Sequence, residues 1–98
     1  MKPLRILVLL LCAACATPGE EVRIDAQRWV GKPFSDLQAE MKKPTSYVNR
    51  SGSKVTSEIL ANGNRDYGTP ISAFCTVHWE IDKAGTIVGY TLEGEGCN

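Results

Sequence analysis

The chain has 98 residues, with eleven basic and eleven acidic side chains and a formal net charge of zero. This length suits one small domain and no more. Because no stretch is rich in lysine or arginine, the composition argues against nucleic acid and anionic lipid headgroups as partners.

The first fourteen residues have the pattern of a signal peptide. Lys2 and Arg5 supply positive charge, an apolar run covers 6–11, and a small pair of alanines occupies 13–14. The run is much shorter than the roughly 20 apolar residues of a membrane-spanning helix. We therefore expect residues 1–14 to be removed. Their loss leaves nine basic against eleven acidic residues, a net charge of −2.

Cys15 follows the small pair, and the stretch Leu11-Cys12-Ala13-Ala14-Cys15 resembles the lipobox of bacterial lipoproteins. In that family the cysteine carries diacylglycerol and usually a further acyl chain such as palmitate, and two or more chains anchor a protein stably. The resemblance implies a lipid on Cys15, no other cofactor, and attachment to the membrane of the bacterial cell envelope. Ala16 replaces the aspartate associated with inner-membrane retention, which favours the outer membrane, facing the periplasm. The alternative is an ordinary secreted protein cleaved after residue 14 or 16.

The remaining cysteines suggest a disulfide. Cys12 would leave with the signal peptide and Cys15 would carry lipid, so Cys75 and Cys97 are left as a pair in an oxidising compartment. Closing a loop of about 22 residues stabilises a small domain by roughly 3 kcal/mol in the chain-entropy model. A metal site is the rival interpretation. We expect none, because His78 is the only histidine and no Cys-x-x-Cys motif occurs.

Two short helices are expected near the start of the mature chain. Residues 15–23 are interpreted as the lipidated cysteine and a polar tether, and residues 24–98 as a single domain. Asp25 is expected to cap a helical turn over 26–30, with Gly31 as its stop.

The second helix is predicted from its start signal. Ser35 and Gln38 have the spacing of a capping box, which predicts a helix over 36–42. Leu37 and Met41, four residues apart, share its apolar face. A proline two residues beyond the helix stops it.

From residue 45 onward the pattern changes to a period of two, which is typical of strands. We expect strands over 47–50 and 54–60 around a Ser-Gly-Ser turn, and a polar loop over 62–70. The clearest strand covers 73–81, where every second residue is apolar.

A hairpin is predicted to end the chain. A turn over 82–85 leads into a last strand whose apolar positions alternate over 88–92. If both apolar faces lie on the same side, Cys75 lies opposite residue 92 or 94. The segment 94–96, with two glycines, must then turn back before Cys97 can reach Cys75. Together the elements predict an α+β fold, with two short N-terminal helices packed on one face of a three- to four-stranded antiparallel sheet.

This layout resembles a known family over roughly residues 29–96. The segment Trp29-Val30-Gly31-Lys32-Pro33, the following helix and the strand pair ending at Cys97 are similar to small outer-membrane lipoproteins of the SmpA/OmlA (BamE-like) family. Those proteins usually have a glycine shortly before a proline, where this chain has Lys42-Lys43-Pro44. Related small lipoproteins with a Cys-rich final hairpin and no assigned activity resemble the chain even more closely. The resemblance implies an accessory role in the envelope, with a protein partner.

A second resemblance is to small periplasmic peptidase inhibitors. It rests on a Val-Gly-x-Pro segment over 30–33 and on an exposed loop before Val55-Thr56. In this alternative the protease-facing residues would be Arg50, Ser51, Gly52, Ser53 and Lys54. The inhibitors' first cysteine has no counterpart near Trp29.

His78 invites a catalytic interpretation, because Glu80 follows it on the same strand face. Catalysis would also need a nucleophile, and no serine is placed near His78 by the sequence, while Thr76 is another polar residue of that face. We therefore expect a solvated strand face and no catalytic residues. The function predicted from the sequence is that of a membrane-anchored, non-enzymatic accessory or binding module.

Overall fold

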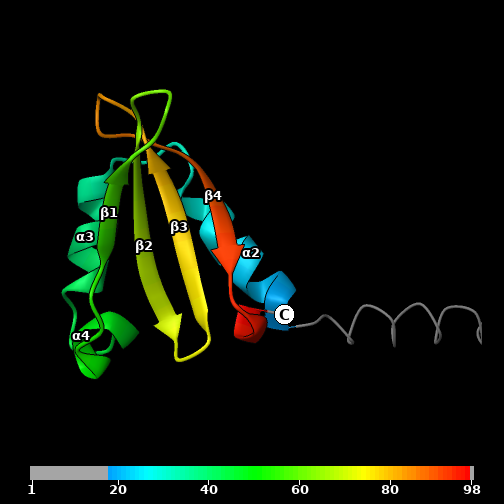
Figure 1. The fold of residues 1–98 in the computed structure, drawn as a ribbon. Helices are drawn as coiled ribbons and strands as arrows, with labels where there is room; N and C mark the ends of the chain where they lie inside the picture. The colour runs from blue at the N-terminus through cyan, green and yellow to red at the C-terminus, as the bar shows by residue number, and fades with distance from the viewer. Residues whose placement is uncertain (1–17, 98) are drawn as a thin grey trace, which may run out of the picture.

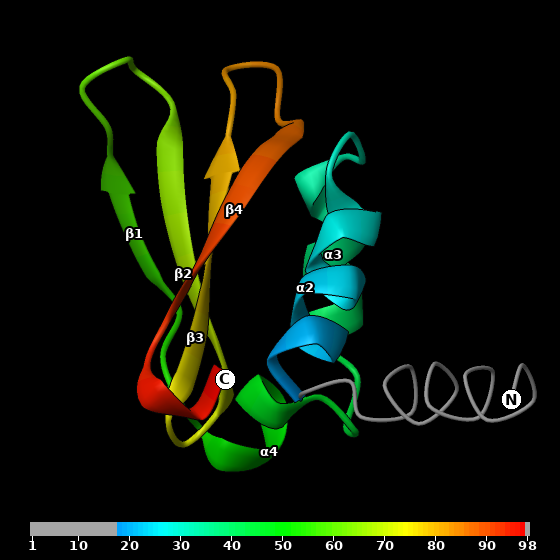
Figure 2. The same cartoon turned by 90° about the vertical axis from the view of Figure 1, so that its right-hand side faces the viewer.

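The computed structural model describes residues 18–97. The expected signal peptide and the expected lipidation site Cys15 lie outside these residues. The elements are α2 (Pro18–Trp29), α3 (Phe34–Met41), α4 (Tyr47–Ser51), β1 (Thr56–Ile59), β2 (Arg65–Ser72), β3 (Cys75–Ile81), β4 (Ile87–Glu93) and a 3-10 turn, η1 (Glu95–Cys97). Figures 1 and 2 show two layers, with α2 and α3 on one face of the sheet and the other face uncovered.

The sheet is antiparallel throughout, in the order β1-β2-β3-β4. Trp79 in the middle of β3 pairs with Tyr67 of β2 on one side and with Tyr90 of β4 on the other, and Ser57 of β1 lies opposite Tyr67. These paired residues form a row across the sheet, on the face that carries the helices. The predicted α+β class, with helices on one face of an antiparallel sheet, is confirmed.

The core lies between the helices and this sheet face. Phe34 of α3 stacks on Tyr67, with ring centroids 4.2 Å apart and planes inclined by 26°. Such a stacked pair stabilises by about 1 kcal/mol beyond its buried area. The buried residues of the core cluster are Ala26, Phe34, Leu37, Val77, Trp79, Ile81 and Ile87.

The first helix is longer than expected. α2 begins at Pro18, so residues 18–23 of the expected polar tether are helical. Proline is favoured at the first helical position, and the acidic side chains of Glu20 and Glu21 suit the positive end of the helix dipole. The expected cap at Asp25 is wrong, because this residue lies inside the helix, with its carboxylate 3.6 Å from Arg28.

The second helix forms as predicted but without the capping box. Pro33 precedes its first residue, no side chain caps the start, and Ser35 lies within the first turn. The backbone sets this start instead, because the Phe34 amide donates to the carbonyl of Gly85 in the β3–β4 turn, at 2.8 Å. Leu37 is buried and Met41 half-buried, as their spacing predicted.

Two further expectations are corrected. The segment 47–50 is not a strand but most of α4, whose start is capped by the Ser46 hydroxyl accepting from the amide of Asn49 at 3.2 Å. Gly52, with φ +69°, ends the helix. The segment 62–70 is not only a loop, because β2 begins at Arg65 and pairs with strands on both sides.

The β3–β4 hairpin confirms the strongest strand prediction. β3 alternates strictly between buried and half-buried residues. The Asp82 carboxylate accepts from the amides of Ala84 and Thr86, and Gly85 takes φ +88° in the turn. A register shift after Glu80 moves Val88 out of the core, where it is 45% exposed, and buries Ile87 in its place.

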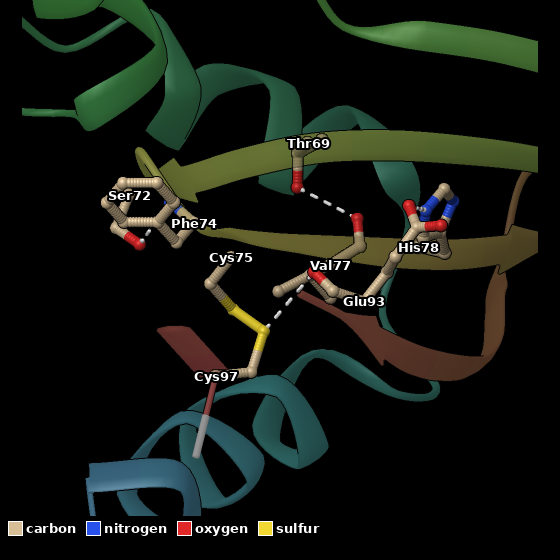
Figure 3. Close-up of a disulfide and its surroundings, with 8 residues drawn as sticks. All are labelled: Thr69, Ser72, Phe74, Cys75, Val77, His78, Glu93 and Cys97. Carbon is tan, nitrogen blue, oxygen red and sulfur yellow. Dashed lines mark hydrogen bonds and ion pairs between the residues drawn. A yellow bond between two sulfur atoms is a disulfide. The ribbon is translucent and has the colours of Figure 1, made fainter. Parts of the chain in front are cut away.

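The predicted disulfide between Cys75 and Cys97 is present (Figure 3). Thr76 pairs with Glu93, so Cys75 falls opposite Gly94, one of the two positions expected. Gly94 takes φ +121° and η1 then turns the chain back, which brings the two cysteine Cα atoms to 4.9 Å. The turn predicted at the glycines before Cys97 is confirmed.

Candidate binding groove and the His78 cluster

A groove of about 780 Å³ opens between the helices and the half of the sheet that ends at the β2–β3 turn. Three helices and two strands contribute to it, because α2 and α3 lie behind different parts of the sheet and α4 lies near the β2–β3 turn (Figure 1). Its apolar and aromatic lining consists of Val22, Ala26, Trp29, Leu37, Met41, Tyr47, Val48, Pro70, Ile71, Val77 and Trp79.

The floor of the groove has no unpaired polar side chain. The Trp79 indole N–H donates to the Thr69 hydroxyl at 2.8 Å, and this hydroxyl donates to the carbonyl of Val77 at 3.3 Å. Thr69 is only 3% exposed, so both bonds are shielded from water. An apolar ligand could therefore cover this floor without breaking a hydrogen bond of the protein.

The rim of the groove carries charges of both signs. Lys32 places its ammonium 5.1 Å from the centre of the Trp29 ring, a cation–π contact at the mouth. The charged lining residues are Arg28, Lys32 and Arg50 on the basic side, and Glu21, Asp25 and Glu40 on the acidic side. Three cations and three anions cancel, so the rim does not select a ligand by net charge.

The uncovered face of the sheet holds a cluster around His78. Its Nδ1 lies 2.9 Å from the Asp66 carboxylate of β2, and its Nε2 lies 2.8 Å from the Glu93 carboxylate of β4. Figure 3 shows His78 and Glu93 on the sheet face away from the helices. Both ring nitrogens can donate to a carboxylate only when the imidazole is protonated. The hydrogen bond to Glu93, followed by the bond to Asp66, raises the pKa of His78 against the opposing effect of burial.

Glu80, the expected neighbour of His78 on this face, has partners of its own. Its carboxylate accepts from the side-chain amides of Asn64 at 2.6 Å and Asn62 at 3.0 Å, and these bonds lower the pKa of Glu80. Sequence reasoning missed these contacts, and that of Asp66 with His78, because it treated 62–70 as a loop. The spacing of Tyr67 and Thr69, two residues apart, was the signal in the sequence that could have predicted a strand here.

The His78 cluster has the geometry of an ion pair and not that of a nucleophile–base pair. Both ring nitrogens face carboxylates, so neither is free to take a proton from a hydroxyl group. Thr91 lies opposite His78 in the strand register, and Thr76 precedes it by two residues on the same face. Within residues 18–97, no hydroxyl group is hydrogen-bonded to the imidazole.

The His78 cluster predicts a pH dependence of stability. Because the folded pKa of His78 lies above its unfolded value near 6.5, its contribution is complete below that pH and is lost as the pH rises through the folded pKa. We expect His78→Gln to lower the melting temperature at about pH 5.5 and to have little effect at about pH 9. The contribution should stay below about 1 kcal/mol, since Glu93 is 74% exposed. A constant difference between the two proteins across this range would contradict the assignment.

The alternative inhibitory segment is partly helical. Arg50 and Ser51 form the last turn of α4, and the Arg50 Nε donates to the carbonyl of Thr45 at 3.2 Å. Gly52 is the helix cap, and the Ser51 hydroxyl bonds that of Ser53 at 2.8 Å. Lys54 is exposed. A protease-facing segment should be extended over several residues to enter a cleft, and this arrangement does not favour that interpretation.

Comparison with known proteins does not assign a function, so the function is inferred from the groove and the His78 cluster. No protein-family model, curated protein or solved structure matches this chain. In the part of the chain that the structure describes, no group of histidine, cysteine and acidic side chains is arranged to hold a metal ion. Over the same residues, no helix is both long and apolar enough to cross a membrane.

Proposed function

We propose that this protein is a lipid-anchored, non-enzymatic binding module of the bacterial cell envelope, and that its groove holds an apolar segment of a partner protein. The observation that carries the proposal is the groove itself, whose volume of about 780 Å³ lies within the roughly 300–1,000 Å³ that ligand sites usually occupy. The lipobox-like sequence ending at Cys15 supports the anchor, and the resemblance of the sequence layout to SmpA/OmlA lipoproteins supports an accessory role.

The chemistry of the groove favours a polypeptide ligand. Apolar side chains supply the contact area, and a rim with equal numbers of cations and anions suits the mixed charges that flank an apolar segment of a protein. A fatty acid or an anionic lipid would instead be matched by an excess of basic residues. The lining contains no histidine or cysteine, and its deepest polar groups, Thr69 and Trp79, bond each other.

The groove can be tested with the protein's own fluorescence. Trp29 and Trp79 are the two tryptophans of the chain, and both line the groove. The uncharged dye N-phenyl-1-naphthylamine, bound there, should accept energy from them and quench their emission. Val48→Glu should weaken dye binding about tenfold or more, because placing a charge against a bound apolar group removes at least the roughly 1.5 kcal/mol of one buried side chain.

A matched control is Val55→Glu. Val55 is the same residue type, is 38% exposed, and does not line the groove. Its variant should bind the dye as the wild type does, and both variants should keep the wild-type circular dichroism spectrum. Equal binding by all three proteins would contradict the groove as a binding site. A photo-crosslinker at position 48, but not at 55, should then join the protein to a partner in intact envelopes.

A further inference from the structure

The tip of the β2–β3 hairpin exposes an aromatic residue that neither the core nor the groove uses. Phe74 is 74% exposed, the highest value among the large apolar residues of the described chain. Leaving a phenylalanine in water forgoes the stabilisation that burial of its ring would contribute. A single exposed apolar side chain is common on protein surfaces, so the case for a contact depends on where Phe74 lies in the molecule.

The backbone under Phe74 is held firmly. Its carbonyl accepts from the Gly96 amide at 2.9 Å, its amide donates to the Ser72 hydroxyl at 3.4 Å, and the next residue is the disulfide-bonded Cys75. A Cβ at Gly94, or at Gly96 in η1, would collide with Phe74, so η1 packs directly on the tip. Figure 3 shows Phe74 and Ser72 at the end of the hairpin beside the disulfide. The fold therefore presents Phe74 on a firmly held backbone.

The start of α2 lies at the same end of the molecule. α2 contacts η1, and η1 in turn bonds Phe74 through Gly96. Figures 1 and 2 agree that the first turn of α2, η1 and the β2–β3 tip share this end, and that the β3–β4 turn lies at the other. Pro18 follows Cys15 by three residues, which span at most about 10 Å when extended. A lipid on Cys15 would therefore hold this end close to the membrane.

We propose that the β2–β3 tip is a membrane contact, in which Phe74 enters the interfacial region of the bilayer that holds the anchor. This inference rests on the lipid anchor of the proposed function. Phenylalanine side chains of proteins that lie on a membrane are buried at the boundary between the headgroups and the acyl chains. The charges of this end are mixed, with Arg50 in α4 and Lys54 shortly after it, against Glu20 and Glu21 in the first turn of α2 and Glu95 in η1. The contact is thus apolar and does not require anionic lipid.

A lipid surface fits the tip better than a protein does, for a geometric reason. The anchor would keep the bilayer within reach of this end at all times, whereas a protein partner would have to compete with that surface. The contact would also restrict rotation about the short linker and turn the groove in a defined direction relative to the membrane. A second point of attachment of this kind needs little affinity, because the anchor already supplies a high local concentration.

The experiment uses the lipidated full-length protein in phosphatidylethanolamine–phosphatidylglycerol vesicles, with and without bromine atoms on the acyl chains near the headgroups. Phe74→Trp adds a tryptophan at the tip, and Val88→Trp adds a matched one at the start of β4, near the opposite end of β3. Bromine quenches only tryptophans that touch the bilayer. The emission added by Phe74→Trp should be largely lost in brominated vesicles, and that added by Val88→Trp should persist. Mass measurement confirms the intact disulfide in both variants.

Each outcome decides between the two proposals. Variants that float with the vesicles, while the emission added by Phe74→Trp is unchanged by bromine, would overturn the membrane contact and leave the anchor standing. Equal quenching at positions 74 and 88 would also overturn it, because the molecule would then lie on the bilayer without a preferred end. Failure of wild type and variants alike to float with the vesicles would overturn the anchor together with the contact that rests on it.

Discussion

Replacing Cys15 by serine should abolish the incorporation of radiolabelled palmitate and move the protein from the membrane fraction to the soluble fraction. Lipid transfer in bacterial lipoproteins requires the cysteine sulfur, and serine offers no thiol. The effect should be close to all-or-none, since two or three acyl chains anchor stably whereas the domain alone presents one exposed aromatic tip. The measurement is palmitate labelling followed by fractionation and immunoblotting.

Cys12→Ser is the matched control for this experiment. It replaces the other cysteine of the same stretch and should leave both the label and the membrane location unchanged, because Cys12 would be removed with the signal peptide. Undiminished palmitate in the Cys15→Ser protein would show that the lipobox resemblance is misleading. An unlabelled but still secreted wild type would point to the ordinary signal peptide of the alternative interpretation.

The elements that the sequence predicted well are those with local signals. The β3–β4 hairpin combines strict alternation with an Asp-x-x-Gly turn, and both features act within a few residues. The fold class followed from these patterns and from the spacing of Leu37 and Met41. The disulfide followed from the elimination of Cys12 and Cys15 in an oxidising compartment, and the parity of strand pairing predicted the turn before Cys97.

β2 was missed because tertiary contacts override its unfavourable composition. Gly68 and Pro70 both weaken a strand, and a proline is expected only at an edge or a bulge. Pro70 lies at a register shift, where the missing amide is tolerated. Gly68 lies where the side chains of Thr56 and His78 approach from both neighbouring strands, and a Cβ there would come within 3.1 Å of the imidazole. Glycine is needed at this position for packing and not for a turn.

The sites could not be predicted because they depend on how elements meet. The groove needs α4, which the β-propensity of Tyr47 and Val48 concealed although Ser46 and Gly52 supply helix caps on both sides. The His78 cluster needs residues from three strands in register, and one of these strands was expected to be a loop. Val88 shows the same limit of prediction from sequence, because a single bulge buries Ile87 in the core and leaves Val88 exposed.

Removing the disulfide should destabilise the domain by about 3 kcal/mol, because the bond closes a 22-residue loop and so restricts the unfolded chain. A typical domain has a free energy of unfolding of roughly 5–15 kcal/mol, and a domain of about 80 residues lies near the lower end of that range. The loss of the disulfide is therefore a large share of the total stability.

The test compares thermal melts of the wild type with and without reductant, and of Cys75→Ala/Cys97→Ala. Alanine is preferred to serine because both sulfur atoms belong to buried residues, 2% and 3% exposed, where a hydroxyl would lack partners. The double variant should melt well below the oxidised wild type and be indifferent to reductant, and the wild type with reductant should approach it. The bond also fixes η1 on the β2–β3 tip, so protease cleavage should begin within 94–97 in the variant. A melting temperature that neither reductant nor the double substitution lowers would show that the strand pairing of β3 and β4 holds this end of the domain without the bond.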